Sequence, residues 1–188
     1  AGDGLLTFAF ELMAWNAQIK GVRPEWVVEA IRSVAQAAGS LGMVGGQAVD
    51  LISEGNAALN GHRAQVLDYI HRHKTGALIR ASVRCGALAA GANPTQLAVL
   101  DRYAAAIGLA FQVQDDILDI ESSTEQLGKQ QGSDLSLNKS TYPSLLGLAV
   151  AKQHAKTLYD DAVAALNDFG DKGMPLRELA HYIIARKF

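Results

Sequence analysis

The sequence predicts an all-α fold. Apolar residues recur three and four positions apart along most of the chain, alanine and leucine are abundant, and the alternating pattern of a strand is scarce. With 188 residues, 49% of them hydrophobic, the chain can bury a sizeable core. We find no internal repeat and no linker, so we expect residues 1–188 to belong to a single helical domain.

Glycine and proline set the expected helix boundaries. Pro24 stands at a first-turn position, and the run Gly91-Ala92-Asn93-Pro94 supplies a stop, a cap and a helix-starting proline in succession. In chain order, we expect helices at 5–19, 24–38, 63–90, 94–121, 141–169 and 175–187.

Two stretches between these helices are unusual. The segment 39–50 is rich in glycine, which normally breaks a helix but also permits close approach between helices or to a ligand; we favour tight helix packing there. The polar segment 122–138 is the longest expected loop, long enough to suspect a functional flap.

Composition limits the function classes. The chain has 17 Lys and Arg against 19 Asp and Glu, so no overall field steers it toward nucleic acid or an anionic membrane surface. The single cysteine, Cys85, excludes an internal disulfide framework and is expected to be a small buried side chain. It fits a reducing compartment, and we expect a cytoplasmic protein with no membrane insertion, because no apolar run reaches spanning length. The start lacks signal-peptide features and an initiator Met, so the numbering is consistent with a start inside a longer protein.

Acidic side chains occur in the most apolar part of the chain, residues 104–120. At helical spacing, apolar residues cover both sides of this segment: Leu100, Ile107, Phe111 and Leu118 on one, and Leu109, Val113, Ile117 and Ile120 on the other. Into this setting the sequence inserts a polar sector about 100° wide, made of Gln112, Asp115, Asp116 and Asp119. The helix is therefore expected to be central, with its carboxylates facing one place.

Crowded carboxylates on a buried helix cost several kcal/mol unless cations or hydrogen-bond donors meet them. Two partners are open: basic side chains from neighbouring helices, or a divalent metal held by oxygen ligands, as Mg²⁺ prefers. For a bare Asp-Asp-x-x-Asp pattern, a solvated helix end is the alternative; the apolar surroundings favour the buried site.

Basic groups that could complete a diphosphate site lie in two places. Lys74 and Thr75 follow His71-Arg72-His73, whose two histidines are spaced two apart and cannot hold one metal together. Lys129 and Lys139 lie in or beside the long loop, where glycines would let it close over an anion. No nucleotide-binding glycine loop occurs.

Four segments of the chain carry a family resemblance: Gly46-Gln47-Ala48-Val49-Asp50-Leu51, His73-Lys74-Thr75-Gly76-Ala77-Leu78, Phe111-Gln112-Val113-Gln114-Asp115-Asp116-Ile117-Leu118-Asp119 and Gly128-Lys129 through Thr141-Tyr142-Pro143. In this order and spacing they resemble the trans-prenyltransferase (polyprenyl synthase) family, and their residues are most similar to those of the bacterial farnesyl diphosphate synthases. The resemblance covers essentially the whole chain. It implies an isoprenoid synthase-type helical bundle.

The resemblance also implies site roles. Asp115, Asp116 and Asp119 would be the second aspartate-rich motif, which binds Mg²⁺ that bridges to the allylic diphosphate. The substrate-binding set would be Lys74, Thr75, Gln112, Lys129 and Lys139, with Lys74 and Asp115 as the catalytic pair. The implied reaction ionises dimethylallyl or geranyl diphosphate and joins it head-to-tail to isopentenyl diphosphate, releasing diphosphate and making farnesyl diphosphate. Apolar helix faces would line a channel for the growing chain, and the family implies a homodimer.

The chain departs from the family pattern at its start. The first aspartate-rich motif and a Gly-Gly-Lys-Arg-x-Arg-Pro-like segment, which in relatives lie upstream, are absent, so the bundle here lacks its N-terminal helices. We expect the native protein to contain that region and the 188 residues alone to be inactive. Two other functions stay open: a non-catalytic subunit or binding module that pairs with an active partner, and a terpene cyclase.

Overall fold

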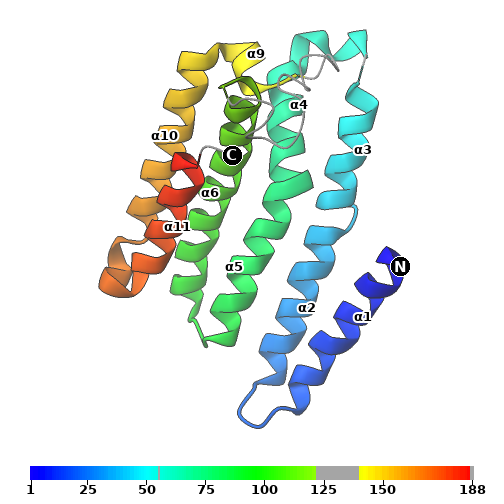
Figure 1. The fold of residues 1–188 in the computed structure, drawn as a ribbon. Helices are drawn as coiled ribbons and strands as arrows, with labels where there is room; N and C mark the ends of the chain where they lie inside the picture. The colour runs from blue at the N-terminus through cyan, green and yellow to red at the C-terminus, as the bar shows by residue number, and fades with distance from the viewer. Residues whose placement is uncertain (55, 122–139, 187–188) are drawn as a thin grey trace.

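The computed structural model describes residues 1–54, 56–121 and 140–186 (Figure 1). Within these ranges the chain is helical and contains no strand, which agrees with the all-α prediction. The elements in chain order are α1 (Gly2–Trp15), η1 (Asn16–Gln18), α2 (Pro24–Ala38), α3 (Met43–Ser53), η2 (Ala57–His62), α4 (Arg63–Ile70), the π-helix η3 (His71–Gly76), α5 (Ala77–Ala89), α6 (Pro94–Glu121), α9 (Tyr142–Leu146), α10 (Leu148–Ala165), η4 (Asn167–Gly173) and α11 (Met174–Ala185).

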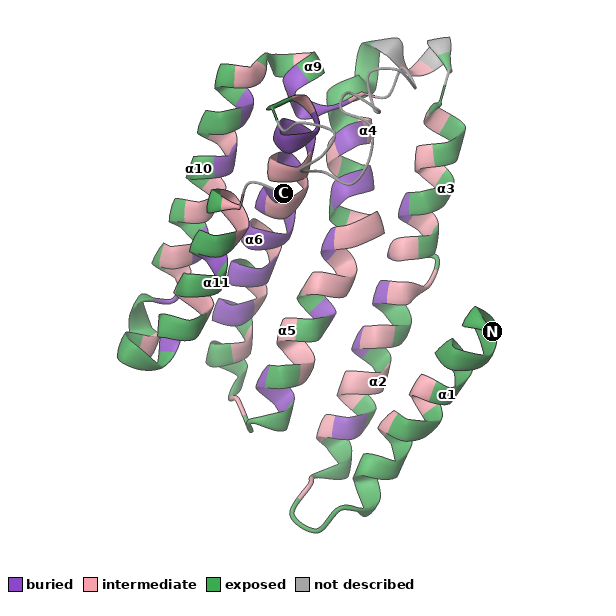
Figure 2. Cartoon of the chain, viewed as in Figure 1, coloured by how far each residue is buried: buried purple, intermediate pink, exposed green. Residues whose placement is uncertain are grey.

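Helix α6 is the centre of the arrangement, as its apolar pattern predicts. It packs against α10 on one side and α5 on the other; α2 lies against α5, α1 lies against α2, and α11 packs on α6 and α10 (Figure 1). Burial falls along this series, from a largely buried α6 to α1, which contains no buried residue (Figure 2). The helix with the aspartates is thus the one most removed from water.

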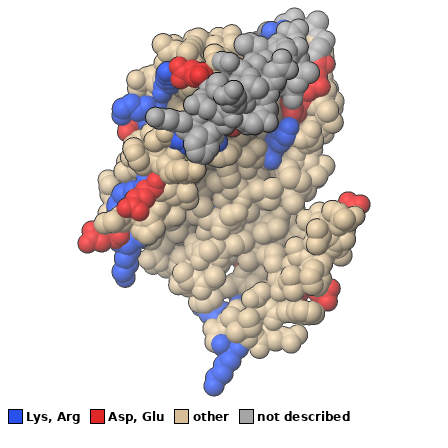
Figure 3. Space-filling view, viewed as in Figure 1, with Lys and Arg blue, Asp and Glu red and all other residues tan. Residues whose placement is uncertain are grey.

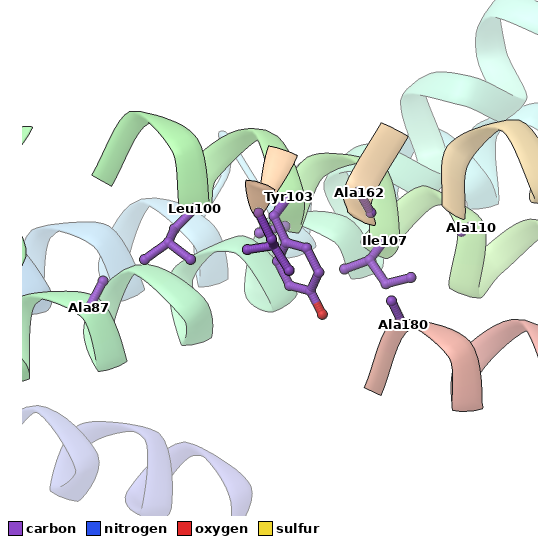
Figure 4. Close-up of a cluster of buried hydrophobic side chains, with 9 residues drawn as sticks. Ala87, Leu100, Tyr103, Ile107, Ala110, Ala162 and Ala180 are labelled. Carbon is purple, nitrogen blue, oxygen red and sulfur yellow. The ribbon is translucent and has the colours of Figure 1, made fainter. Parts of the chain in front are cut away.

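The core consists of two clusters of buried side chains arranged along α6. The first surrounds Tyr103 and Ile107, with alanines of α5, α10 and α11 closing on them (Figure 4). The hydroxyl of Tyr103 donates to the carbonyl oxygen of Leu176 at 2.8 Å, and burial raises the pKa of Tyr103 to about 12. The second cluster joins Leu109, Val113 and Ile117 to α4, α9 and α10. The small alanines let the helices approach closely around the larger side chains.

The predicted cap before α6 is confirmed. Gly91 has a φ of 74°, which takes the chain out of α5, and α6 begins at Pro94. Between them, the Asn93 side chain accepts from the Gln96 N–H while the Gln96 side chain accepts from the Asn93 N–H, both at 2.9 Å. The register of α6 is therefore set by local hydrogen bonds at its start.

Three expected helices differ from the structure. The helix expected at 5–19 ends at Trp15, and a short 3₁₀ turn follows. The helix expected at 63–90 has a π-helical turn at its centre, η3. The helix expected at 141–169 is interrupted at Gly147, whose φ of 85° ends α9 before α10 begins, and it gives way to 3₁₀ turns from Asn167. The expected loop 122–138 lies outside the described residues.

The glycine-rich stretch shows the tight packing that the sequence predicts. Gly46 lies inside α3, and a Cβ at this position would come 2.3 Å from the backbone nitrogen of Lys74. No side chain fits in that space. Glycine therefore lets α3 lie directly on the π-helix, and that contact positions Lys74.

The face in Figure 3 carries acidic and basic groups side by side at its margins, with wide areas of neither between them. Among the described residues, no helix is long and apolar enough to cross a membrane. Cys85 is partly buried, with its thiol 3.8 Å from the Ala30 carbonyl oxygen, and burial raises the pKa of the thiol. The burial of Cys85 is thus less complete than the sequence predicts, and its raised pKa is not that of an activated nucleophile.

Candidate active site

The π-helix η3 presents the two polar side chains that the sequence assigns to diphosphate. Lys74 donates from Nζ to Asp50 Oδ2 of α3 at 2.7 Å, and the two side chains are 33% and 16% exposed. Thr75 donates from Oγ1 to Gln112 Oε1 of α6 at 3.2 Å. Short π-helical turns are frequent at functional sites because they redirect side chains. Here the turn joins α3 and α6 through a lysine and a threonine.

A second glycine contact holds η3 against α6. A Cβ at Gly108 would lie 3.4 Å from the Cα of Gly76 and 3.6 Å from Ile79. The two backbones therefore approach closely one turn before Gln112. Gln112 is in turn one turn before Asp115, so the structure brings Thr75, Gln112 and the start of the acidic sector into one region.

Asp115 is the most exposed of the three aspartates in the acidic sector, with 48% of its side chain accessible. Arg186 donates from Nη2 to Asp115 Oδ1 at 3.2 Å and to the Phe111 carbonyl oxygen at 3.4 Å. Its guanidinium lies over the Phe111 ring, 4.4 Å from the ring centre. Arg186 is thus a basic partner of Asp115, which is one of the two kinds of partner that the sequence leaves open.

Asp116 is buried and directed toward other elements. Its Oδ2 accepts the backbone N–H of Tyr142, the first residue of α9, at 2.9 Å. Its Oδ1 lies 3.9 Å from Nε2 of His71. Burial lowers the pKa of His71 to about 4, so the imidazole is neutral at pH 7. Asp119, 1% exposed, is the most enclosed carboxylate of the motif.

Tyr142 links this buried carboxylate to α4. Its hydroxyl donates to Asp68 Oδ1 at 3.3 Å, while Arg72 donates to Asp68 Oδ2 at 2.6 Å. Burial, with the nearby Asp68 carboxylate, raises the pKa of Tyr142 well above its ordinary value. The ring of Tyr142 also packs between the rings of His71 and His154, at centre distances of 5.5 and 5.3 Å. Asp116 is therefore part of a network that spans α4, η3, α6, α9 and α10.

The histidines of the 71–73 run lie apart, as their spacing predicts. His71 is buried beside Asp116, whereas His73 stacks on Tyr69 and bonds the Tyr69 carbonyl oxygen at 2.7 Å. Across 1–54, 56–121 and 140–186, no three histidine, cysteine or acidic side chains are grouped so as to hold an ion by themselves. Lys129 and Lys139 lie outside the described residues.

The sequence reasoning missed four participants: Asp50, His71, Tyr142 and Arg186. Asp50 and Tyr142 stand in the motifs that carry the family resemblance, so their chemistry was available as a signal. His71 was considered only as a metal ligand and not as a neighbour of Asp116. Arg186 gives no local signal, because its contact with Asp115 joins residues 71 positions apart.

A cavity of about 450 Å³ lies among α2, α5 and α6. Its wall mixes Ala77 and Ala81 with Arg32, Arg80, Arg84 and Asp101, so it is not the apolar channel that the resemblance implies. Arg84 spans the wall, donating to Asp101 at 2.6 Å and to Glu29 at 2.9 Å. Hydrogen bonds from Arg32 and Arg84 hold the pKa of Glu29 at about 2. Two of the three arginines are thereby paired with carboxylates.

Comparison with known proteins identifies the family of the chain. The polyprenyl synthetase family model matches residues 1–173. The chain belongs to the polyprenyl synthetase family. It is 49% identical over 190 residues to the farnesyl diphosphate synthase of Escherichia coli (strain K12), in a match covering 99% of this chain and 62% of that protein.

Two solved structures of the family show the same fold. An FPP/GFPP synthase from Zymomonas mobilis superposes with a TM-score of 0.82 at 35% identity, covering 97% of this chain and 59% of its own. A geranyltransferase from Helicobacter pylori, complexed with magnesium and isoprenyl diphosphate, gives 0.76 at 33% identity, covering 97% and 57%. The chain thus spans about three fifths of the length of these family members.

Proposed function

We propose that the protein to which these residues belong is a Mg²⁺-dependent prenyltransferase. It condenses isopentenyl diphosphate with an allylic diphosphate, dimethylallyl or geranyl, head-to-tail, and releases diphosphate. The observation that carries the proposal is the hydrogen bond from Thr75 to Gln112, because it joins the two helical segments to which the family resemblance assigns diphosphate and metal binding. One turn further along α6, the half-exposed Asp115 is open to an incoming cation.

The donor set fits Mg²⁺. Asp115 offers a half-exposed carboxylate, the type of ligand that Mg²⁺ prefers, and Asp116 and Asp119 complete the acidic sector beside it. Mg²⁺ is usually held by one or two carboxylates plus substrate phosphates, so the lack of a three-ligand group within the described residues is compatible with it. When bound, the ion would stabilise negative charge on the departing diphosphate. A solved relative supports this choice, since the geranyltransferase from Helicobacter pylori is complexed with magnesium and isoprenyl diphosphate.

The chain's own residues would act on the diphosphate and on the cation that it leaves. Lys74 would bind a diphosphate oxygen once the ammonium exchanges Asp50 for the substrate. Thr75 and Gln112 would orient the same group, and the family resemblance suggests Lys129 and Lys139 as further diphosphate-binding residues. The allylic C–O bond then breaks, the alkene of isopentenyl diphosphate forms the new C–C bond, and a proton leaves.

Two further parts of the proposal concern the product of the reaction and the assembly of the protein. We propose farnesyl diphosphate as the product because of the 49% identity to a farnesyl diphosphate synthase, although a solved relative is named as an FPP/GFPP synthase. The homodimer, the cytoplasmic location, the single domain and the inactivity of residues 1–188 alone stay predictions.

The test is an assay of isopentenyl diphosphate consumption by the complete native protein, with dimethylallyl or geranyl diphosphate and Mg²⁺. Chain extension supports the proposal. Conversion of a single allylic substrate to a ring compound would instead mean a terpene cyclase. No turnover, in a protein that binds a second related chain, would mean a non-catalytic subunit.

A further inference from the structure

Two consecutive aspartates of α6 have different surroundings. Asp115 has 48% of its side chain accessible and faces Arg186. Asp116 is 8% exposed and faces Tyr142 and His71. Neighbouring residues of a helix point about 100° apart, so one ligand cannot approach both side chains in the same way.

The bond from Asp116 to Tyr142 fixes the start of α9. Thr141 and Ser144 form a reciprocal capping box there, and Tyr142 is the first helical residue after the cap. The Tyr142 N–H belongs to the first turn of a helix, where no backbone acceptor is within reach. The carboxylate of Asp116 satisfies this buried donor from another helix.

The surroundings of Tyr142 make that anchor rigid. Its hydroxyl is bonded to Asp68, and its ring packs against His71, which also faces the second oxygen of Asp116. The network closes on itself, from Asp116 to Tyr142 to His71 and back. Oδ2 of Asp116 thus acts as a structural acceptor for the Tyr142 N–H, while His71 lies 3.9 Å from its other oxygen.

We propose that Asp116 is a positioning residue that anchors the start of α9 to α6 by accepting the Tyr142 N–H, leaving Asp115 as the ligand-facing carboxylate of the pair. The role of Asp115 rests on the proposed function. The role of Asp116 does not, because it follows from contacts within the protein. It also narrows the metal assignment, since Asp116 then shapes the site without touching the ion.

Asparagine separates the two roles of an aspartate at this position. In Asp116→Asn the amide oxygen still accepts the Tyr142 N–H. A bond to Mg²⁺ would be weakened, because the negative charge is lost. In Asp116→Ala both the acceptor and the charge are lost. The matched control is Asp115→Asn, the same change one residue earlier.

The first measurement is hydrogen exchange at the Tyr142 amide in the native protein, with no substrate. We expect slow exchange in the wild type, Asp115→Asn and Asp116→Asn, and exchange faster by about tenfold or more in Asp116→Ala, because a buried hydrogen bond is lost. If Asp116→Ala fails to fold while Asp116→Asn folds, the result also supports the anchor, because only asparagine keeps the hydrogen-bond acceptor. Equal exchange in Asp116→Ala and the wild type would overturn the anchor.

The second measurement is the affinity for inorganic diphosphate in the presence of Mg²⁺, by isothermal titration calorimetry. We expect Asp115→Asn to weaken binding by about 100-fold, and Asp116→Asn to stay within about threefold of the wild type. Equal losses in the two asparagine variants would mean that Asp116 binds the ion, which contradicts the proposal. If the wild type shows no Mg²⁺-dependent binding, the proposed function fails, and the exchange measurement still decides the role of Asp116.

Discussion

The two halves of α6 solve the problem of burial in different ways. The first half is covered by apolar side chains: Tyr103 and Ile107 are almost fully buried among alanines of the neighbouring helices. The second half is also buried but carries Asp116 and Asp119, and hydrogen bonds or charges from several elements meet the acidic sector. Buried apolar side chains need only neighbours of complementary shape, whereas a buried carboxylate needs a hydrogen-bond donor or a positive charge in a particular place. Substitutions in the first half of α6 are therefore expected to change stability, and substitutions in the second half to change ligand binding and catalysis.

The sharpest test of this division is Asp115→Ala in the complete native protein. We expect kcat/KM to fall by about 10³-fold, or about 4 kcal/mol of transition-state stabilisation, because the carboxylate open to Mg²⁺ is removed. Thermal stability should fall less than activity, because Asp115 is 48% exposed, although Arg186, only 12% exposed, loses its carboxylate partner. Steady-state kinetics and calorimetry check both parts. A variant with nearly unchanged turnover would contradict the assignment of Asp115.

The opposite result is expected for Ile107→Ala in the first half. Ile107 is 2% exposed, so its truncation leaves a cavity and should lower the free energy of unfolding by about 3 kcal/mol. The KM for the allylic substrate should stay unchanged in the folded protein, because the side chain packs away from the acidic sector. Urea unfolding gives the first value. A large rise in KM with unchanged stability would break the comparison.

Gly46→Ala tests how closely the polar half depends on packing. The added methyl would meet the backbone nitrogen of Lys74, so α3 and η3 must separate. We expect a loss of stability of about 2 kcal/mol and weaker diphosphate binding, because Lys74 moves with its backbone. Gly61→Ala is a control, since its Cβ would meet nothing within 4 Å. Identical diphosphate affinity in both variants would mean that Lys74 does not depend on this contact.

The smallest effect is expected for Tyr103→Phe, which removes one hydrogen bond from the apolar half. At neutral pH it should cost about 1 kcal/mol of stability. The pKa of Tyr103 is raised from 10.0 to about 12, so the unfolded chain loses the proton first as the pH rises. The wild type should therefore lose its advantage over Tyr103→Phe between about pH 10 and 12. Parallel stability curves for the two proteins would contradict the burial of this hydroxyl.

The sequence predicts the fold better than it predicts the site. The helix class, the cap at Asn93, the central place of α6 and the tight contact of Gly46 follow from local patterns, and the structure confirms them. The directions of Asp115 and Asp116 do not follow from sequence, since both belong to one polar sector and only the neighbours of each distinguish them. Arg186 and Tyr142 contact the acidic residues from distant parts of the chain, and such contacts produce no periodic pattern in the sequence.

In the π-helical turn at 71–76, the directions of the side chains depend on the number of residues in the turn. Its hydrogen bonds close over one residue more than those of an α-helix. Deleting a single residue here would let the ladder revert to the α-helical spacing, and the residues inside the turn would lose the wide spacing that lets His71 and Lys74 face different elements. His71 would then turn from Asp116, or Lys74 from Asp50, even though every other amino acid stayed the same. At this turn the number of residues matters as much as their identity.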